Sequence, residues 1–253
     1  MSAFTVLIPA RLKSTRLPGK PLADIAGKPM VVRVAERALA AGASRVVVAL
    51  DDASVEAACR VHGIETIMTR PDHLTGTDRL SEAVSKLGLH DDEIVVNVQG
   101  DEPLMPVEVI RSVAGLLAER DCAIATAAHP ITDIEAFMNP NVVKVALDSE
   151  SYALTFSRAP LPYPRDHFRD QKPGLPADLP AYHHLGIYAY RVKFLKRFPT
   201  LEQPPLERYE SLEQLRALFY GERIVVKVLN EDLPAGVDTP EDLERVRAHF
   251  CRQ

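Results

Sequence analysis

The segment FTVLIPARLKSTRLPGKPLADIAGKPMVVRVAERALAAGASRVVVAL, residues 4–50, determines the fold. It begins and ends with short apolar runs, 4–10 and 45–50, that are typical of buried strands. Between them, residues 28–42 carry apolar side chains at helical spacing and end at Gly42, a common residue at helix C-termini. Strand, helix and strand in this order predict a parallel βαβ unit.

The same alternation continues along the chain. Further strands are expected at 65–68, 93–100, 122–128, 141–147, 181–191 and 223–229, and further helices at 51–63, 76–88, 106–120, 206–221 and 236–250. We therefore predict an α/β fold with a Rossmann-like, mostly parallel sheet and helices on both faces. Ligands of such sheets bind beyond the carboxyl ends of the strands, which draws attention to the loops after Ala10 and Val98.

One stretch departs from this alternation. Residues 157–180 contain six prolines and no hydrophobic period, so they predict an extended excursion from the sheet. The sequence leaves open whether this excursion is a lid, a linker or a dimer arm.

Composition excludes several classes of protein. No apolar run among the 253 residues is long enough to span a membrane, and the start lacks the basic region of a signal peptide. The three cysteines are odd in number and far apart, which argues against a disulfide framework and a structural zinc site. We therefore expect a cytoplasmic protein without membrane insertion.

Charge is concentrated at one end of the chain. Residues 1–37 carry seven Lys or Arg against two acids, a net +5, which leaves −10 for the rest of a chain whose total is −5. An acidic body argues against a nucleic-acid-binding protein, whose basic surface would be broad. A local basic loop suits a small anion, and the alternative is an ordinary solvated charged surface.

The basic loop follows the first strand and contains Arg11, Arg16 and Lys20. It matches neither GxxxxGK[ST] nor GxGxxG, so it is not a Walker loop or a dinucleotide fingerprint. A loop with more Arg and Lys than glycine suits a triphosphate, whose charge must be neutralised as diphosphate leaves.

Two acidic motifs complement this loop. Asp101, in the motif NVQGDEP, follows a buried strand, and a carboxylate facing a polyphosphate needs a cation between them, usually Mg²⁺. The alternative there is an ordinary turn. Asp238, in GVDTPED, is a second carboxylate, but the same residues are a good helix start with Thr239 or Asp238 as N-cap. Spacing alone favours the capping role for Asp238.

Seven ordered blocks carry a resemblance to a known family: RLKSTRLPGKPL, HLTGTDR, VVNVQGDEP, SRAPLPYPR, HHLGIYAYR, LERYESLEQLR and GVDTPEDLERV. Together they resemble the CMP-sugar synthetases, in particular the branch that acts on 3-deoxy-manno-octulosonate (Kdo). The sialic-acid branch is similar in the opening loop but less so in QGDEP and LEQLR. One departure is Thr75, where the family often has serine, and it keeps the hydroxyl.

The resemblance implies a fold of the nucleotide-diphospho-sugar transferase type, with one cytidylyltransferase domain over 1–253. An arm at 152–190 would contribute to a homodimer and to the sugar-acid site. The implied reaction transfers CMP from CTP to Kdo with Mg²⁺, releases diphosphate, and supplies lipopolysaccharide synthesis. Two alternatives stay open: a cytidylyltransferase for another sugar acid (8-amino-Kdo or sialic acid), and a non-catalytic nucleotide-binding module.

The resemblance also implies roles for individual residues. Arg11, Ser14, Arg16 and Lys20 would bind the triphosphate, Arg79 and the Pro9–Ala10 backbone the cytidine, Asp101 and Asp238 the magnesium, and Gln99, Arg158, His184, Tyr188, Glu213 and Gln214 the sugar acid. Of these, Arg11, Arg16, Lys20 and Asp101 would act in catalysis. The sugar's carboxylate needs a cationic partner, for which Arg158 is the first candidate and His184 the second. Without the resemblance, Glu213 and Gln214 would be interpreted as solvated helix residues.

Overall fold

The computed structural model describes residues 3–13, 17–73, 75–171, 173–230, 233–234 and 236–252. The strands are β1 (Thr5–Ala10), β2 (Asp24–Ile25), β3 (Lys28–Pro29), β4 (Arg45–Leu50), β5 (Glu65–Met68), β6 (Ile94–Asn97), β7 (Ile124–Pro130), β8 (Lys144–Leu147), β9 (Ala153–Ser157), β10 (Tyr182–Arg191) and β11 (Ile224–Val228). The helices are α1 (Met30–Ala40), α2 (Ala53–Val61), α3 (Gly76–Lys86), α4 (Val107–Glu119), α5 (Ile134–Met138), α6 (Arg165–Arg169), α7 (Val192–Arg197), α8 (Pro205–Glu210), α9 (Gln214–Phe219) and α10 (Pro240–Phe250), with 3-10 turns η1 (Lys20–Leu22) and η2 (Phe198–Thr200).

The predicted α/β sheet is confirmed. Its main strand order is β11-β7-β10-β6-β1-β4-β5, with β8 and β9 joined through β10. β1 runs parallel to both β4 and β6, so Ala10 lies opposite Leu50 and Leu7 opposite Asn97. The carboxyl ends of these three strands therefore meet at one edge, where the basic loop and the NVQGDEP motif emerge.

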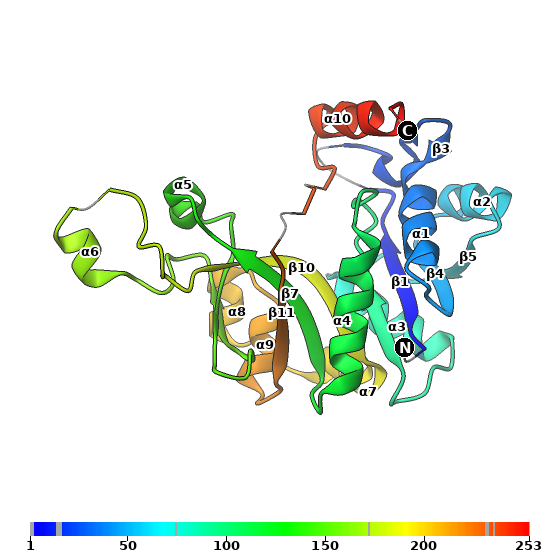
Figure 1. Cartoon of the computed structure of the whole chain (residues 1–253). Coiled ribbons are helices and arrows are strands. Elements are labelled where there is room, and N and C mark those ends of the chain that lie inside the picture. The colour runs from blue at the N-terminus through cyan, green and yellow to red at the C-terminus, as the bar shows by residue number, and fades with distance from the viewer. Residues whose placement is uncertain are drawn as a thin grey trace.

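Helices cover both faces, as expected. The first core cluster packs α1, α2 and α4 against one face, and the second packs α3, α7 and α9 against the other. A smaller cluster joins the start of α1 to the β2–β3 hairpin and α10 through Ile25, Met30 and Leu243. Figure 1 shows α10 beside this hairpin, which places the C-terminal motif near the basic loop.

The excursion is shorter than the range 152–190 suggested. β9 pairs with β8, and β10 runs antiparallel between β6 and β7, in the middle of the sheet. Within 152–190, the described residues leave the sheet between β9 and β10, where Figure 1 shows α6 standing away from the body. Alternating tyrosines identified β10 as a strand, but the direction of pairing is not encoded in its period.

The helix expected at 206–221 is two short helices. The chain breaks at Ser211, whose φ of 52° and ψ of 48° are left-handed. Arg216 of α9 then turns back onto Glu207 of α8 and donates two hydrogen bonds to its buried carboxylate, at 2.7 and 2.6 Å. This buried ion pair holds the two short helices against each other.

No described helix is both long and apolar enough to cross a membrane. Cys59, Cys122 and Cys251 are all free thiols.

Candidate active site

A cavity of about 280 Å³ opens where β1 and β6 end. Its lining comes from the β1 loop (Pro9, Ala10, Arg11, Lys13), η1 (Lys20, Pro21), the start of α3 (Gly76) and the loop after β6 (Gln99, Gly100, Asp101). Parallel pairing of β1 with β6 brings the two loops together, as the position of the motifs predicted. Ser14 and Arg16, which were expected to bind the triphosphate, lie outside the described residues.

Lys20 bridges the two carboxylates that were expected to hold magnesium. Its ammonium lies 2.6 Å from Asp101 Oδ2 and 3.0 Å from Asp238 Oδ1. The ammonium is well covered, with 12% of the side chain exposed, while the two carboxylates are 35% and 49% exposed. Two carboxylates are thus held around one cation at the mouth of the cavity.

Backbone contacts fix the position of Asp238. The Val237 N–H donates to the Asp101 carbonyl at 2.8 Å, which ties the two acidic motifs together. Thr239, not Asp238, is the N-cap of α10, and it forms a capping box with Asp242. Asp242 also accepts from the Asp238 N–H, so the Asp238 carboxylate is not used in capping and pairs with Lys20. The capping interpretation of this motif is therefore correct for Thr239 only.

Glu102 is a residue that the sequence analysis missed. The residue is half-buried beside Asp101, and its covered Oε2 has no hydrogen-bond partner in the described part of the chain. Burial, and next the charge of Asp101, raise the pKa of Glu102 to about 8. The raised pKa keeps the Glu102 carboxyl mostly protonated at neutral pH, so it does not add a third negative charge beside Asp101 and Asp238. The adjacent acids in QGDEP were the available signal.

Gly100 permits the close approach of the two loops. A Cβ on this residue would lie 2.8 Å from the Pro9 carbonyl oxygen, a backbone atom that has little room to move. The glycine in NVQGDEP is therefore required by the contact between the ends of β1 and β6.

Replacing Gly100 by alanine should lower stability. Forcing the two strand ends apart is expected to cost about 1–3 kcal/mol in the free energy of unfolding, measured by urea denaturation. Gly115→Ala is the matched control, because a Cβ there meets nothing within 4 Å and α4 gains helix propensity. Equal stability of Gly100→Ala and the native protein would contradict this account.

Arg79 lies in the interior and not on the cavity wall. It is fully buried, and its guanidinium donates to Thr69 Oγ1 at 2.5 Å and to Asp51 Oδ2 at 2.9 Å. In this conformation it is shielded from a bound cytidine, because neighbouring residues cover it completely. Gly76 of the same GTDR motif does line the cavity, and Thr75 caps α3 with its hydroxyl, as the serine it replaces would.

Three of the residues expected to bind the sugar acid lie together. Tyr188, Glu213 and Gln214 line a small cavity of about 20 Å³ on the α3 side of the sheet. Thr77 donates to Glu213 Oε2 at 2.7 Å, and burial raises the pKa of Glu213. The Gln214 side-chain nitrogen is buried without a hydrogen-bond partner in the described structure, so a donor is available there. These residues are not solvated. The helical period alone had suggested that Glu213 and Gln214 face the solvent.

The other expected sugar-acid residues lie elsewhere. Gln99 lines the larger cavity with Lys20 and Asp101. Arg158 stands at the base of the excursion, where its side chain donates to the carbonyls of Glu210 at 2.6 Å and Pro140 at 3.0 Å.

His184 is not a cation in this structure. Its ring is buried against Phe156 and Tyr188, with Nε2 2.9 Å from Thr126 Oγ1. The Thr126 hydroxyl donates to the Ile187 carbonyl, so it accepts from the histidine ring. Burial lowers the pKa of His184 to about 3, which makes the ring neutral at physiological pH. The expectation that His184 could pair with a carboxylate as a cation is therefore wrong.

The same burial predicts a pH dependence of stability. The pKa of His184 is near 6.5 in the unfolded chain and about 3 in the folded protein, so its contribution is present above pH 6.5 and is lost as the pH falls toward 3. Through this histidine, the free energy of unfolding should fall by up to about 1.4 kcal/mol for each pH unit below 6.5. We expect His184→Gln to remove this part of the pH dependence, measured by urea unfolding between pH 6.5 and 4.5. Identical slopes in the two proteins would contradict it.

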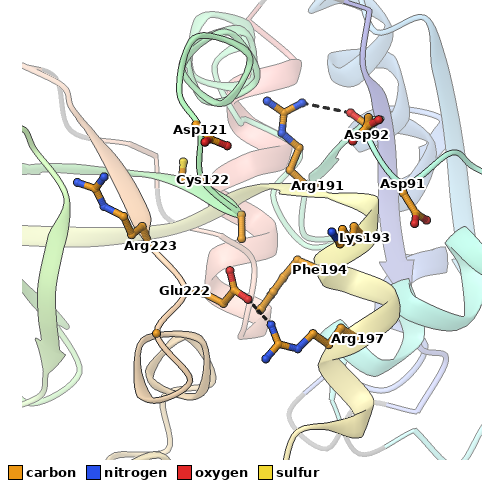
Figure 2. A pocket seen from close by; sticks show the side chains of 12 residues that line it. Asp91, Asp92, Asp121, Cys122, Arg191, Lys193, Phe194, Arg197, Glu222 and Arg223 are labelled. Carbon is orange, nitrogen blue, oxygen red and sulfur yellow. Dashed lines mark hydrogen bonds and ion pairs between the residues drawn. The ribbon is translucent and has the colours of Figure 1, made fainter.

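A larger hollow, of about 620 Å³, lies at the opposite end of the sheet, where β7 and β11 begin. Figure 2 shows its walls, which carry Asp91, Asp92, Asp121 and Glu222 together with Arg191, Lys193, Arg197 and Arg223. Arg197 pairs with Glu222, and Arg191 donates to the carbonyls of Asp92 and Leu117. Acids and bases are equal in number, so this hollow has no preference for an anion, unlike the cavity at the strand ends.

Comparison with known proteins identifies the family to which the chain is similar. A family model described as cytidylyltransferase matches residues 5–224. A solved CMP:2-keto-3-deoxy-manno-octonic acid synthetase complexed with CTP is 41% identical, covers 99% of both chains and superposes with a TM-score of 0.87. A cytidylyltransferase from Leptospira borgpetersenii serovar Hardjo-bovis (strain JB197) is 16% identical, covers 100% of this chain and 88% of its own, and has a TM-score of 0.63. The second likeness concerns the fold alone.

Proposed function

This chain belongs to the cytidylyltransferase family, and we propose that it transfers CMP from CTP to the anomeric hydroxyl of Kdo, releasing diphosphate. The observation that carries the proposal is the cavity at the strand ends, where basic side chains face the paired carboxylates of Asp101 and Asp238 across Lys20. The 41% identity to a Kdo-activating synthetase complexed with CTP supports both substrates.

The cavity suits a nucleoside triphosphate. Arg11 and Lys20 line it on the side of the basic loop, and the Pro9–Ala10 backbone borders the place proposed for cytidine. Ser14 and Arg16 of the same loop are proposed as further triphosphate ligands. Arg79 would support the cytidine site from behind, since it is buried beneath the loop.

Asp101 and Asp238 are proposed as the ligands of Mg²⁺. Their oxygens lie close enough to share one ammonium. Hard oxygen ligands in small number, completed by phosphate oxygens, are the donor set that Mg²⁺ prefers. When bound, the ion would neutralise charge that develops on the phosphates. Lys20 would then turn from the carboxylates toward the leaving diphosphate.

The proposed reaction needs positioning and charge neutralisation and no protein nucleophile. The anomeric oxygen of Kdo forms a bond to the α-phosphorus while the bond from that phosphorus to the bridging oxygen of diphosphate breaks. The hydroxyl proton is released to water, and the bonding electrons leave with diphosphate. Arg11 and Lys20 would hold the departing diphosphate in line with the attacking oxygen.

The sugar acid would bind between the nucleotide cavity and the Glu213 region. Gln99 borders the first, Tyr188, Glu213 and Gln214 border the second, and Gly76 and Thr77 of α3 join them. The small cavity would have to widen to admit an eight-carbon sugar. Arg158 remains our candidate for its carboxylate, because the described residues hold its guanidinium through backbone carbonyl groups and leave its charge without an ion pair among them. His184 would contribute as a neutral hydrogen-bonding group.

We also propose that the protein is a homodimer that supplies activated Kdo for lipopolysaccharide assembly. Several large apolar side chains are exposed near the base of the excursion and on α8: Met138, Leu154, Tyr163, Leu206 and Tyr209. Helix α8 is joined to this base, because Glu210 accepts from Ser157 at 2.7 Å. Sedimentation of the full chain at twice the monomer mass would support the dimer.

Diphosphate release tests the proposed function. CTP, Mg²⁺ and Kdo should give stoichiometric diphosphate, with little from UTP or from sialic acid. No release from CTP and Kdo would overturn the proposal. Faster release with 8-amino-Kdo would instead identify a related substrate, and CTP binding without turnover on any sugar acid would indicate a non-catalytic nucleotide-binding module.

A further inference from the structure

Asp51 connects the basic loop to the core of the sheet. It follows β4 directly, and because β4 runs parallel to β1, it lies beside the start of the loop. Its Oδ1 accepts from the Leu12 N–H at 3.2 Å, and its Oδ2 accepts from Arg79 at 2.9 Å. Only 12% of the Asp51 side chain is exposed, so both bonds are largely shielded from water.

The far side of Asp51 is rigidly held. Arg79 is fully buried and also donates to Thr69 Oγ1. Thr69 in turn donates to the Leu50 carbonyl through its N–H at 2.8 Å and its hydroxyl at 2.9 Å. A continuous hydrogen-bonded path therefore runs from the end of β4 through Thr69, Arg79 and Asp51 to the backbone of Leu12.

The contact is placed where the loop needs it. β1 ends at Ala10, so the Leu12 N–H lies beyond the strand ladder. Leu12 stands between Arg11 and Lys13, which both line the triphosphate cavity, so fixing its backbone also fixes its two cationic neighbours. Arg11 receives a second anchor from its own side chain, which donates to the His73 carbonyl at 2.6 Å.

Charge gives Asp51 a second effect on the loop. Burial lowers the pKa of Arg79, the charge of Asp51 raises it, and the charge of Arg11 lowers it, so the two arginines are close enough to repel. The Asp51 carboxylate neutralises Arg79, which limits this repulsion and leaves the charge of Arg11 available to an anion.

We propose that Asp51 is a positioning residue for the triphosphate, which acts through the Leu12 N–H to hold Arg11 and Lys13 at the cavity. This inference rests on the proposed binding of CTP. The competing explanation is that Asp51 serves only as the counter-ion of buried Arg79, in which case the bond to Leu12 has no effect on the nucleotide.

A pair of double variants separates the two explanations. Asp51→Asn with Arg79→Met, and Asp51→Ala with Arg79→Met, both remove the buried charge together with its counter-ion. Only asparagine keeps an oxygen that can accept from the Leu12 N–H. Calorimetric titration with CTP, thermal midpoints, and the KM values for CTP and Kdo are measured for both.

We expect similar thermal midpoints and the same KM for Kdo in the two double variants. The alanine version should bind CTP about three- to tenfold more weakly than the asparagine version, the effect of one hydrogen bond. Equal CTP affinities would overturn the positioning role. Native protein that binds no CTP would instead overturn the proposed function, so the two failures are distinguishable.

Two further measurements keep the inference testable if the double variants do not fold. In the native protein without nucleotide, exchange of the Leu12 amide hydrogen should be slowed at least about tenfold relative to an unstructured peptide, and exchange at the unprotected rate would overturn the proposal. Glu207→Gln weakens the other buried ion pair, with Arg216, far from the loop along the chain. It should lower the thermal midpoint and leave the affinity for CTP unchanged, and a matching loss of CTP affinity would overturn the inference.

Discussion

Asp101→Asn is expected to lower kcat/KM at least about 100-fold while the protein stays folded. An amide binds Mg²⁺ less well than a carboxylate, and a loss of about 3 kcal/mol of transition-state stabilisation gives this factor. The fold should survive because the side chain is 35% exposed and Lys20 keeps its second partner, Asp238. Diphosphate release over a range of Mg²⁺ concentrations, together with the thermal midpoint, measures both effects.

The matched control for this variant is Asp92→Asn. Asp92 is an exposed acid at the opposite end of the sheet, beside the hollow of Figure 2, and its replacement should leave the rate unchanged. A higher Mg²⁺ requirement in Asp101→Asn would show that the carboxylate acts through the metal. Native turnover in Asp101→Asn at limiting Mg²⁺ would show that the metal is bound elsewhere.

Lys20→Met should have two effects of opposite sign. Catalysis should fall by about 100-fold or more, since a cation is lost from the triphosphate cavity. In the absence of nucleotide, however, a divalent cation should bind about tenfold more tightly. The ammonium lies 2.6 and 3.0 Å from the same two carboxylates, so it would compete for them with the proposed metal. Titration with Mn²⁺, followed by electron paramagnetic resonance, measures this affinity without any turnover.

Lys13→Met is the control for the metal measurement. It removes one cation from the same cavity and leaves Lys20 on the carboxylates, so the affinity for Mn²⁺ should change little. Unchanged or weaker Mn²⁺ binding in Lys20→Met would mean that lysine and metal occupy separate places. Such competition would mean that the proposed metal enters with the nucleotide, whose phosphates would offer Lys20 another partner.

Local signals in the sequence predicted most elements of the fold. Apolar runs and helical periods located β1, β4, α1, α3 and α4, because these patterns report which side chains face a core. They failed where tertiary contacts override the period. The helix expected at 206–221 breaks at the left-handed Ser211, and the buried pair Glu207–Arg216 joins α9 to α8 across the break.

Part of the site was predictable because local patterns in the sequence also show where strands end. The loop after β1 and the acidic motif after β6 were recognisable from their positions at strand ends, and both line one cavity. The partial burial of Glu102 was not, since an acid adjacent to Asp101 reads as one more exposed charge. The neutral ring of His184 also depends on its surroundings, because burial and not residue type lowers its pKa.

The sequence by itself determined the alternation of strands and helices and the basic loop at the first strand end. It also placed the N-cap of the last helix at either Asp238 or Thr239. Only the tertiary structure decided that Lys20 meets two carboxylates 81 and 218 residues away, that β10 enters the sheet antiparallel, and that Arg79 lies behind the loop on Asp51. The hydrophobic period of a segment indicates whether a side chain is buried. The residues that bury it depend on the packing of segments far apart in the chain.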